Sequence, residues 1–411
     1  MKDHTKQQTG FLRENLRWIG GGFLLMFFSS FGQTFFVGLS GGSLRARFDL
    51  SVGQFGGLYM TATLASALTL PCLGRTLDLM PGWKVARFAI PGLAIACVLM
   101  CVAQRVAMLM LALYLLRLFG QGMMTEIAFT EVGRWFHADR GRAMALIVPG
   151  VQAGSALLPV TVVLVKSLGG WRMPWLSSAV LLMLVGYPLV TGLLRVERMP
   201  KSQEPAARGQ RTARDWTRRE VLRDPIFYLL LAGTLAPPFI GTTIFFHQSY
   251  LIAIRGYDPL VFSAAFPVMA VTTVLFGLLC GHLIDRFGAL RLLPFFLTPL
   301  AVASATVGLV TPAWGIYLFM FLLGISNGFT QTLLGALWPE VYGLANLGGI
   351  RALIVSSMVL ATAVGPGITG VLIDLGLPLP GQMLWMALWC VVASLAMGIA
   401  AHAVRLRECR T

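Results

Sequence analysis

Three ionisable residues lie inside long apolar stretches of the sequence, where a charge is costly. Arg117 and Glu126 share one stretch, and His247 lies near the end of another. An arginine can bind an anion, a carboxylate can carry a proton, and an imidazole titrates between about pH 5 and pH 8. Each also has a structural reading: an arginine bonded to backbone at a helix bend, a solvated or gating carboxylate, and a histidine satisfied by water or Gln248. Both readings stay open at this point.

Five amide side chains fall at middle depths of four apolar stretches, one of which is the stretch that holds Arg117. They are Gln33, Gln121, Gln152, Asn327 and Gln331. An unpaired amide in an apolar medium is unfavourable, so each must either line a hydrated cavity or hydrogen-bond between helices. We treat them as candidates for substrate contact, with helix bridging as the alternative.

The residue pattern offers nothing that resembles an enzyme's active site. The six cysteines include no CxxC pair and no neighbouring His cluster, so we read them as small apolar residues and expect no metal site and no cofactor. Paired carboxylates, an activated nucleophile at depth and a Walker-type phosphate loop are also missing from the sequence. We therefore predict neither an enzyme nor a protein driven directly by ATP.

The composition predicts an all-α membrane protein. Of the 411 residues 56% are hydrophobic and 12% are charged, whereas a soluble domain carries about a quarter charged residues. A helix that crosses the bilayer needs about 20 mostly apolar residues. Dividing the chain at charges and turns gives twelve such segments: 18–40, 52–73, 85–104, 107–133, 143–167, 171–194, 226–252, 261–281, 291–311, 313–336, 350–373 and 382–404.

The positive charge is distributed by side. With twelve spans, 25 of the 32 Lys and Arg residues fall on one side, six fall on the other, and Arg117 alone lies within a span. The positive-inside rule then places both termini on the cytoplasmic side of the membrane, which we expect to be a bacterial inner membrane. The net charge of +15 is thereby explained without a nucleic-acid partner. The basic loop is expected to touch anionic head groups of the lipid bilayer.

Two halves of the chain repeat a short turn motif. Gly74 precedes Asp78 by four residues, and Gly281 precedes Asp285 in the same way, 207 positions later. Such a repeat predicts two pseudo-symmetric six-helix bundles. The expected organisation is a cytoplasmic N-terminal segment (1–17), a first bundle (18–194), a basic linker (195–225), a second bundle (226–404) and a cytoplasmic tail (405–411).

These motifs resemble those of the major facilitator superfamily. Gly281 to Arg291 is similar to the family's loop signature, including Arg286, while the first copy has Leu79 at the usual Arg position. Trp135 to Ala143 resembles the monocarboxylate porter and oxalate/formate antiporter branches. Those branches commonly carry a cation deep in span eight or eleven, and Arg351 here lies only at the cytoplasmic mouth of span eleven.

The resemblance implies gates at the two cytoplasmic turns. Asp78 and Asp285 would pair with basic residues or helix N-termini in one state and release them in the other. Arg134, Arg140 and Arg142 are available to the first copy, and Glu340 is available to Arg286 in the second. The resemblance also implies a substrate site near the bilayer midplane. Arg117, about 15 Å into span four, reaches that depth.

The predicted function is secondary active transport of a small organic anion, such as a monocarboxylate, by a functional monomer. Arg117, the five amides and His247 are the predicted substrate contacts. Protons are the candidate coupling ion, with Glu126 as candidate carrier. Glu126 follows Arg117 by nine residues, which turns the two side chains about 180° apart. The alternative is an exporter of amphipathic compounds, for which the 26 Phe and 19 Met residues could line a permissive cavity.

Overall fold

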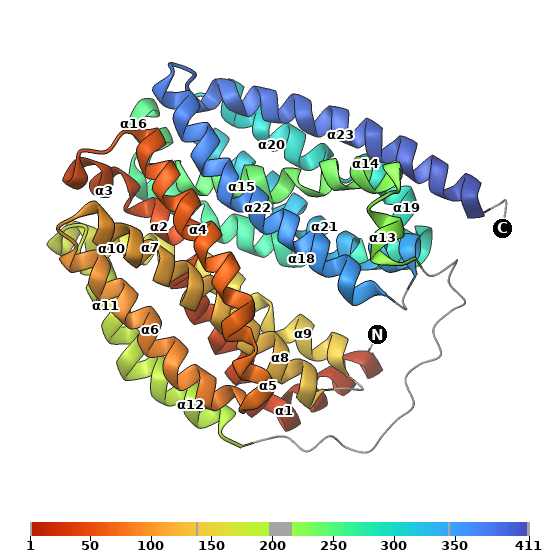
Figure 1. The fold of residues 1–411 in the computed structure, drawn as a ribbon, viewed down its shortest axis with the longest axis horizontal. Helices are drawn as coiled ribbons and strands as arrows, with labels where there is room; N and C mark the ends of the chain where they lie inside the picture. The colour runs from red at the N-terminus through yellow and green to blue at the C-terminus, as the bar shows by residue number, and fades with distance from the viewer. Residues whose placement is uncertain (1, 137–138, 197–215, 344–345, 409–411) are drawn as a thin grey trace. The chain divides into compact units, whose positions relative to one another are not determined.

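The structure is a computed structural model that describes residues 2–136, 139–196, 216–343 and 346–408 (Figure 1). Within these ranges the chain is helical throughout and contains no β-strand. Much of the predicted basic linker lies outside the described residues. The side chains of residues 2–10, 12 and 140 are likewise not described.

The prediction of twelve spans is confirmed, because twelve helical segments are long and apolar enough to cross a membrane. They are Arg13–Leu39, Val52–Leu79, Gly82–Val102, Val106–Trp135, Gly141–Gly169, Met173–Leu194, Pro225–Phe246, Pro259–Phe287, Ala289–Leu309, Trp314–Tyr342, Leu347–Asp374 and Leu379–Arg407. Span seven ends at Phe246, six residues before the predicted limit. The helix breaks at His247, whose backbone angles (φ −89°, ψ 11°) leave the helical region.

The chain separates into two compact units, each described here by itself. The first contains Met1–Ser43 and Thr61–Ala207, and the second contains Leu44–Met60 and Arg208–Thr411. Helix α4 (Val52–Gly74) therefore contributes its beginning to the second unit and its end to the first.

The helices before the linker include three short irregular segments. In order they are α1 (Lys2–Ser29), the 3-10 segment η1 (Ser30–Gly32), α2 (Thr34–Leu39), α3 (Gly41–Phe48), α4, α5 (Thr76–Leu79), α6 (Gly82–Val102), α7 (Val106–Leu115), the π-helical η2 (Leu116–Met124), α8 (Thr125–Trp135), α9 (Arg140–Ile147), α10 (Pro149–Gly169), α11 (Met173–Leu181), the π-helical η3 (Leu182–Gly186) and α12 (Tyr187–Leu194).

Some of the helices after the linker begin or end at recognisable capping residues. They are α13 (Arg218–Val221), α14 (Pro225–Thr234), α15 (Ala236–Phe246), α16 (Gln248–Arg255), α17 (Pro259–Ala264), α18 (Phe266–Phe287), α19 (Ala289–Leu292), η4 (Leu293–Phe295), α20 (Thr298–Leu309), α21 (Trp314–Tyr342), α22 (Leu347–Asp374) and α23 (Leu379–Glu408). Asp224 and Asp258 accept the amides of Ile226 and Leu260, each with proline at the first helical position. Helix α18 ends at Gly288, whose φ of 81° suits glycine.

Close helix packing in the second unit depends on glycine. A Cβ added at Gly328 of α21 would lie 2.6 Å from the carbonyl oxygen of Thr273 in α18. At Gly56 of α4, it would lie 2.5 Å from the carbonyl oxygen of Pro366 in α22. Since both neighbours are backbone atoms, these helices approach as closely as only glycine permits. Phe55 of α4 also stacks on Phe246, with ring centroids 4.9 Å apart.

Candidate functional site

Arg117 lies in the interior of the first unit and is only 4% exposed. Its Nη1 donates a hydrogen bond to Thr34 Oγ1, 3.3 Å away, so the guanidinium of span four meets the polar beginning of α2. It belongs to the π-helical segment η2. Such segments recur at functional sites, because the extra residue per turn redirects a side chain. The structure thus places the predicted intramembrane cation inside the bundle.

A break in the helix of span one packs against the segment that carries Arg117. The helix changes to a 3-10 turn over Ser30–Gly32 and becomes extended at Gln33 (φ −77°, ψ 154°) before α2 begins. A Cβ added at Gly32 would lie 2.2 Å from the carbonyl oxygen of Leu116 and 2.7 Å from Cα of Gly120. The interruption therefore packs directly on the π-helical segment that carries Arg117. Irregular backbone at membrane depth is tolerated only inside protein or along a cavity.

Three of the predicted amides gather around this interruption. Gln33 forms it, and the backbone nitrogen of Gln121 lies beside Gly32. Gln152 belongs to α10, two residues before Gly154, which packs against Ser30. All three are half-buried, and Oε1 of Gln121 is buried without a hydrogen-bond partner among the described residues. Spans one, four and five thus bring these three residues to the interruption, which packs on the segment that carries Arg117.

Glu126 lies apart from this group. Its side chain is exposed on α8, whereas Arg117 is buried. The predicted separation of the two residues around the helix agrees with this difference. A role for Glu126 in proton transfer remains a prediction.

His247 is buried in the second unit between α15 and α16. Its Nε2 lies 3.1 Å from the carbonyl oxygen of Pro366 and 3.0 Å from Thr369 Oγ1. The Thr369 hydroxyl itself donates to Gly365, so both neighbours accept, and we assign the proton to Nε2. The imidazole therefore joins the end of span seven to span eleven. The other two amides lie on α21, Asn327 half-buried and Gln331 exposed.

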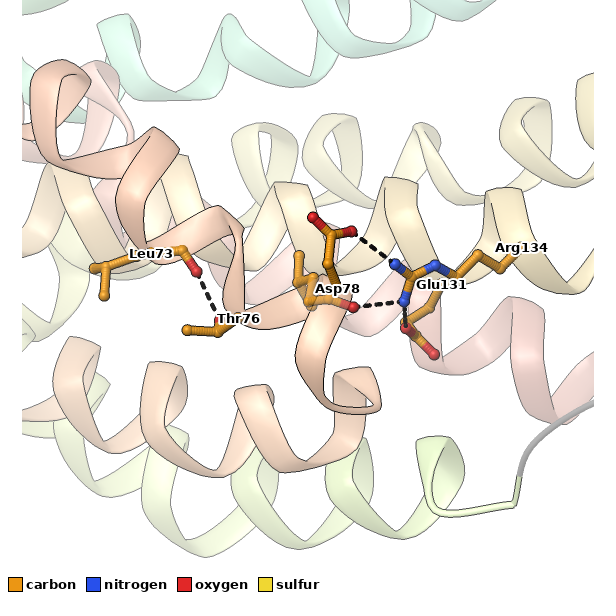
Figure 2. A network of polar contacts seen from close by, with 6 residues as sticks. Leu73, Thr76, Asp78, Glu131 and Arg134 are labelled. Carbon is orange, nitrogen blue, oxygen red and sulfur yellow. Dashed lines mark hydrogen bonds and ion pairs between the residues drawn. The ribbon is translucent and has the colours of Figure 1, made fainter.

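The first turn motif forms an ion-paired cluster at the end of α5 (Figure 2). Arg134 Nη2 lies 3.1 Å from Asp78 Oδ1, and its Nη1 donates to the carbonyl oxygen of Leu77 at 2.6 Å. Nη1 also lies 3.5 Å from Oε1 of Glu131, which is buried. Gly74, four residues before Asp78, is half-buried at the end of α4. The structure therefore joins Asp78 to Arg134, the first of its predicted partners.

The other two predicted partners of Asp78 are accounted for differently. Arg142 lies 3.5 Å from Asp139 and over the ring of Phe11. The side chain of Arg140 lies outside the described residues.

The second turn motif uses a backbone amide where the sequence suggested an ion pair. Glu340 Oε2 accepts the amide of Ala289 at 3.1 Å, next to Gly288. Arg286 lies over the ring of Phe287, and no ion pair with Glu340 forms among the described residues. Asp285 is exposed and Gly281 is half-buried. The suggested pairing of Glu340 with Arg286 is thus absent, because the carboxylate instead caps the start of α19.

Each of the two motifs has a glutamate that packs on the start of a neighbouring helix. The sequence pointed to Glu340 in the second motif but not to Glu131 in the first. A Cβ on Gly82, the first residue of α6, would lie 2.3 Å from Cγ of Glu131, so Glu131 packs on that helix start as Glu340 does on α19. Gly82 and Ala289 are 207 positions apart, the offset of the two aspartates. Glu131 was missed because it lies outside the Gly-x-x-x-Asp turn. Its offset from Glu340, 209 positions, was the available signal.

A second group that the sequence analysis missed surrounds Asp374, at the end of α22. Its carboxylate accepts hydrogen bonds from the Ser51 hydroxyl at 2.5 Å, the Val52 amide at 3.2 Å and the Gly53 amide at 2.9 Å. All of these residues belong to the second unit. A carboxylate at the first amides of a helix satisfies donors that otherwise lack a partner and interacts favourably with the helix dipole.

Comparison with known proteins decides the family. Residues 22–366 match the sequence profile of the Major Facilitator Superfamily. The chain belongs to this superfamily, whose members are membrane transporters. None of the curated proteins compared with the sequence matches it.

Solved structures share the superfamily fold. A crystal structure of a bacterial homolog of the human lysosomal transporter Spinster, inward-facing and unoccupied, matches with a TM-score of 0.69 and 15% identity over 94% of this chain and 96% of that one. The inward-facing, occupied form matches with a TM-score of 0.67 and 16% identity over 95% and 96%. At such identity the likeness establishes the fold alone.

Membership of the Major Facilitator Superfamily confirms the coarse prediction of a multi-pass transporter. It does not support the monocarboxylate or oxalate/formate branch suggested by Trp135 to Ala143. Within the described residues, no group of three His, Cys, Asp or Glu side chains could hold a metal ion.

Proposed function

We propose that this superfamily member is a secondary transporter of a small organic anion, working by alternating access. The burial of Arg117 carries this proposal. A guanidinium in the interior of a membrane bundle costs at least about 3 kcal/mol, and an anionic substrate would offset part of that cost. The neighbouring amides could orient a carboxylate, since each presents N–H donors.

The contacts at the helix ends support alternating access. Asp78 with Arg134 and Glu340 with Ala289 hold turns at the predicted cytoplasmic side. Asp374 holds α4 at the opposite end of that helix. Polar contacts of this kind can form and break without disturbing an apolar core. The two similar bacterial structures are inward-facing, which is one of the states that alternating access requires.

The test is a thermal-shift screen of the detergent-purified protein against short mono- and dicarboxylates, sugars and lipophilic cations. A ligand that prefers the folded state stabilises it and so raises the apparent melting temperature. At a ligand concentration of 100 times the Kd, the free energy of unfolding increases by about 2.7 kcal/mol. We expect a carboxylate to stabilise the wild type and Arg117→Lys, and to leave Arg117→Ala unaffected. The matched control is Arg75→Ala, which removes an exposed arginine of the same unit.

Two results would count against the proposal. Equal stabilisation of the wild type and a folded Arg117→Ala variant by the same carboxylate would remove Arg117 from the site. Stabilisation only by lipophilic cations would favour the exporter of amphipathic compounds.

A further inference from the structure

His247 ties the end of span seven to span eleven within the second unit. It lies at the break between α15 and α16 and is only 3% exposed. Its Nε2–H donates to the carbonyl oxygen of Pro366, 3.1 Å away, and the same nitrogen lies 3.0 Å from Thr369 Oγ1. Both residues belong to α22. We call this contact of His247 with Pro366 and Thr369 the histidine joint.

The histidine joint accommodates a neutral imidazole and not a protonated one. A neutral ring has one N–H, and that N–H is the one on Nε2. The other nitrogen, Nδ1, forms no hydrogen bond among the described residues. A proton added there would create a second donor and a full charge on a side chain that is almost completely buried. Because a buried charge without a partner is strongly unfavourable, the proton is accepted when the ring reaches water.

The charged groups near His247 do not offset this penalty. Arg45 of α3, a half-buried cation, repels an imidazolium. Asp374 of α22 attracts one, but its carboxylate already accepts three hydrogen bonds from residues at the start of α4. Tyr250 of α16 is a neutral phenol whose pKa is raised by burial. Helices α15 and α4 contain no charged residue.

These surroundings change the pH at which His247 takes up a proton. Burial, with a smaller contribution from Arg45, lowers the pKa of His247 to about 4 from an ordinary value of about 6.5. Between these two values a ring in water is protonated, whereas the ring in the histidine joint is neutral. Acid therefore favours conformations in which His247 has left α22. Between pH 7.5 and pH 5 the two pKa values change the population ratio by about 30-fold.

We propose that His247 is a proton-operated switch at the predicted outer side of the transporter. A proton bound at Nδ1 breaks the histidine joint and separates the end of span seven from span eleven. The backbone is suited to this movement, because the helix is already interrupted at His247 and α16 ends at Gly256, whose φ of 64° favours glycine. The switch is distinct from the proposed anion site around Arg117, which belongs to the other unit.

Electron paramagnetic resonance between two nitroxide labels measures this separation. The labels are attached at Ala253→Cys in α16 and Leu375→Cys just after α22, both exposed positions, after the six native cysteines are replaced by serine. Once attached, the labels do not titrate, so their distance can be compared at pH 7.5 and pH 5 in the substrate-free, full-length protein. We expect the ratio of the longer to the shorter distance to rise about 30-fold in the wild-type background.

Three variants separate His247 from other titrating groups. His247→Gln keeps an N–H donor for the Pro366 carbonyl oxygen but takes up no proton, so its distances should not change with pH. His282→Gln is the matched control, because it removes an exposed histidine from α18 of the same unit and should keep the wild-type response. Arg45→Gln removes the repelling cation, so the buried imidazolium becomes less unfavourable and the response should shrink.

Three results would each overturn the proposal. The first is an unchanged distance distribution in the wild-type background between pH 7.5 and pH 5. The second is an equal pH response in a folded His247→Gln variant, which would assign the titration to another group such as Asp374. The third, which stays informative if His247→Gln does not fold, is a response in Arg45→Gln as large as in the wild-type background. The measurement uses no substrate, so none of these results depends on whether Arg117 binds an anion.

Discussion

Asp224 is an acidic residue whose charge is held at the beginning of span seven. Its side chain is 1% exposed and receives two hydrogen bonds from Arg407, at 2.8 and 2.9 Å. The Tyr342 hydroxyl and the Ile226 amide also donate to it. Burial by itself would raise the pKa of Asp224, but these donors together lower the pKa below its ordinary value. Asp224 therefore joins the start of span seven to the ends of spans ten and twelve, through Tyr342 and Arg407.

This arrangement predicts a pH-dependent contribution to stability. A carboxyl whose pKa is lowered by folding stabilises the protein fully above its unfolded value, about 3.9, and loses that contribution as the pH falls through the folded value. Asp224→Asn should therefore be less stable than the wild type by about 1–3 kcal/mol near pH 7. The difference should shrink below about pH 4. Melting temperatures in detergent across this range would measure it.

Asp78→Asn is the matched control for Asp224. Asp78 also pairs with an arginine, but its side chain is 75% exposed. An exposed pair is worth about 0–1 kcal/mol, so this variant should melt close to the wild type at every pH. A pH-independent loss in Asp224→Asn would mean that the amide's shape, and not the charge, is responsible.

The residues that the sequence could identify are those in unusual places. Arg117 stood out because it is a cation in mid-span, and its burial agrees with that prediction. Glu131, Asp224 and Asp374 did not stand out, because carboxylates near helix ends are ordinary in sequence. Their importance comes from partners up to about 320 positions away, such as Ser51 for Asp374. One sequence carries no direct signal for such contacts.

At the scale of the element, the main deviation from the predicted helices is the irregular backbone of spans one and four. Hydropathy indicates that a segment crosses the membrane but not that its helix is interrupted, since the apolar composition continues through Ser30–Gly32 and Leu116–Met124. The interruption is stabilised by tertiary packing between two glycines, Gly32 and Gly120. The sequence gives no signal that pairs these two glycines, because they are 88 positions apart.

This close contact predicts an unequal effect of two similar substitutions. Gly32→Ala places a methyl group 2.2 Å from the Leu116 carbonyl oxygen, so the backbones must separate. We expect a loss of about 1–3 kcal/mol, the usual cost of overpacking. Gly20→Ala in α1 meets no atom within 4 Å and should be neutral or stabilising by up to about 1 kcal/mol. Thermal unfolding of both variants would decide it, and a Gly32→Ala protein as stable as Gly20→Ala would contradict the packing described here.

At the scale of the whole molecule, the sequence predicts two bundles that meet at the linker, whereas the two compact units of the structure divide the chain at one further place. The beginning of α4 belongs to the second unit, although it comes from the first half of the sequence. Internal repeats could predict two halves because they compare residues along the chain. They could not show where residues 44–60 pack, because that depends on Asp374 and the glycines of α22.

Since α4 continues without a break from one unit into the other, relative movement of the units must bend α4 or release Asp374. We expect release, because three hydrogen bonds are more easily exchanged with water than the helix is broken. Asp374→Ala should then expose the start of α4. The reporter is Val52→Cys, at a side chain that is 8% exposed, in a protein whose six native cysteines are replaced by serine.

Labelling of intact cells with a membrane-impermeant thiol reagent measures this exposure from the predicted outer side. Loss of the Asp374 contacts should raise the labelling rate at least about fivefold, as expected for 1 kcal/mol shifted toward the open state. Asp258→Ala is the matched control, because Asp258 also caps a helix start on that side, but its carboxylate accepts the amide of Leu260 in its own helix and, among the described residues, forms no hydrogen bond to another helix. An equal rate in both variants would mean that Asp374 holds α4 in every state, and that α4 itself bends when the transporter opens.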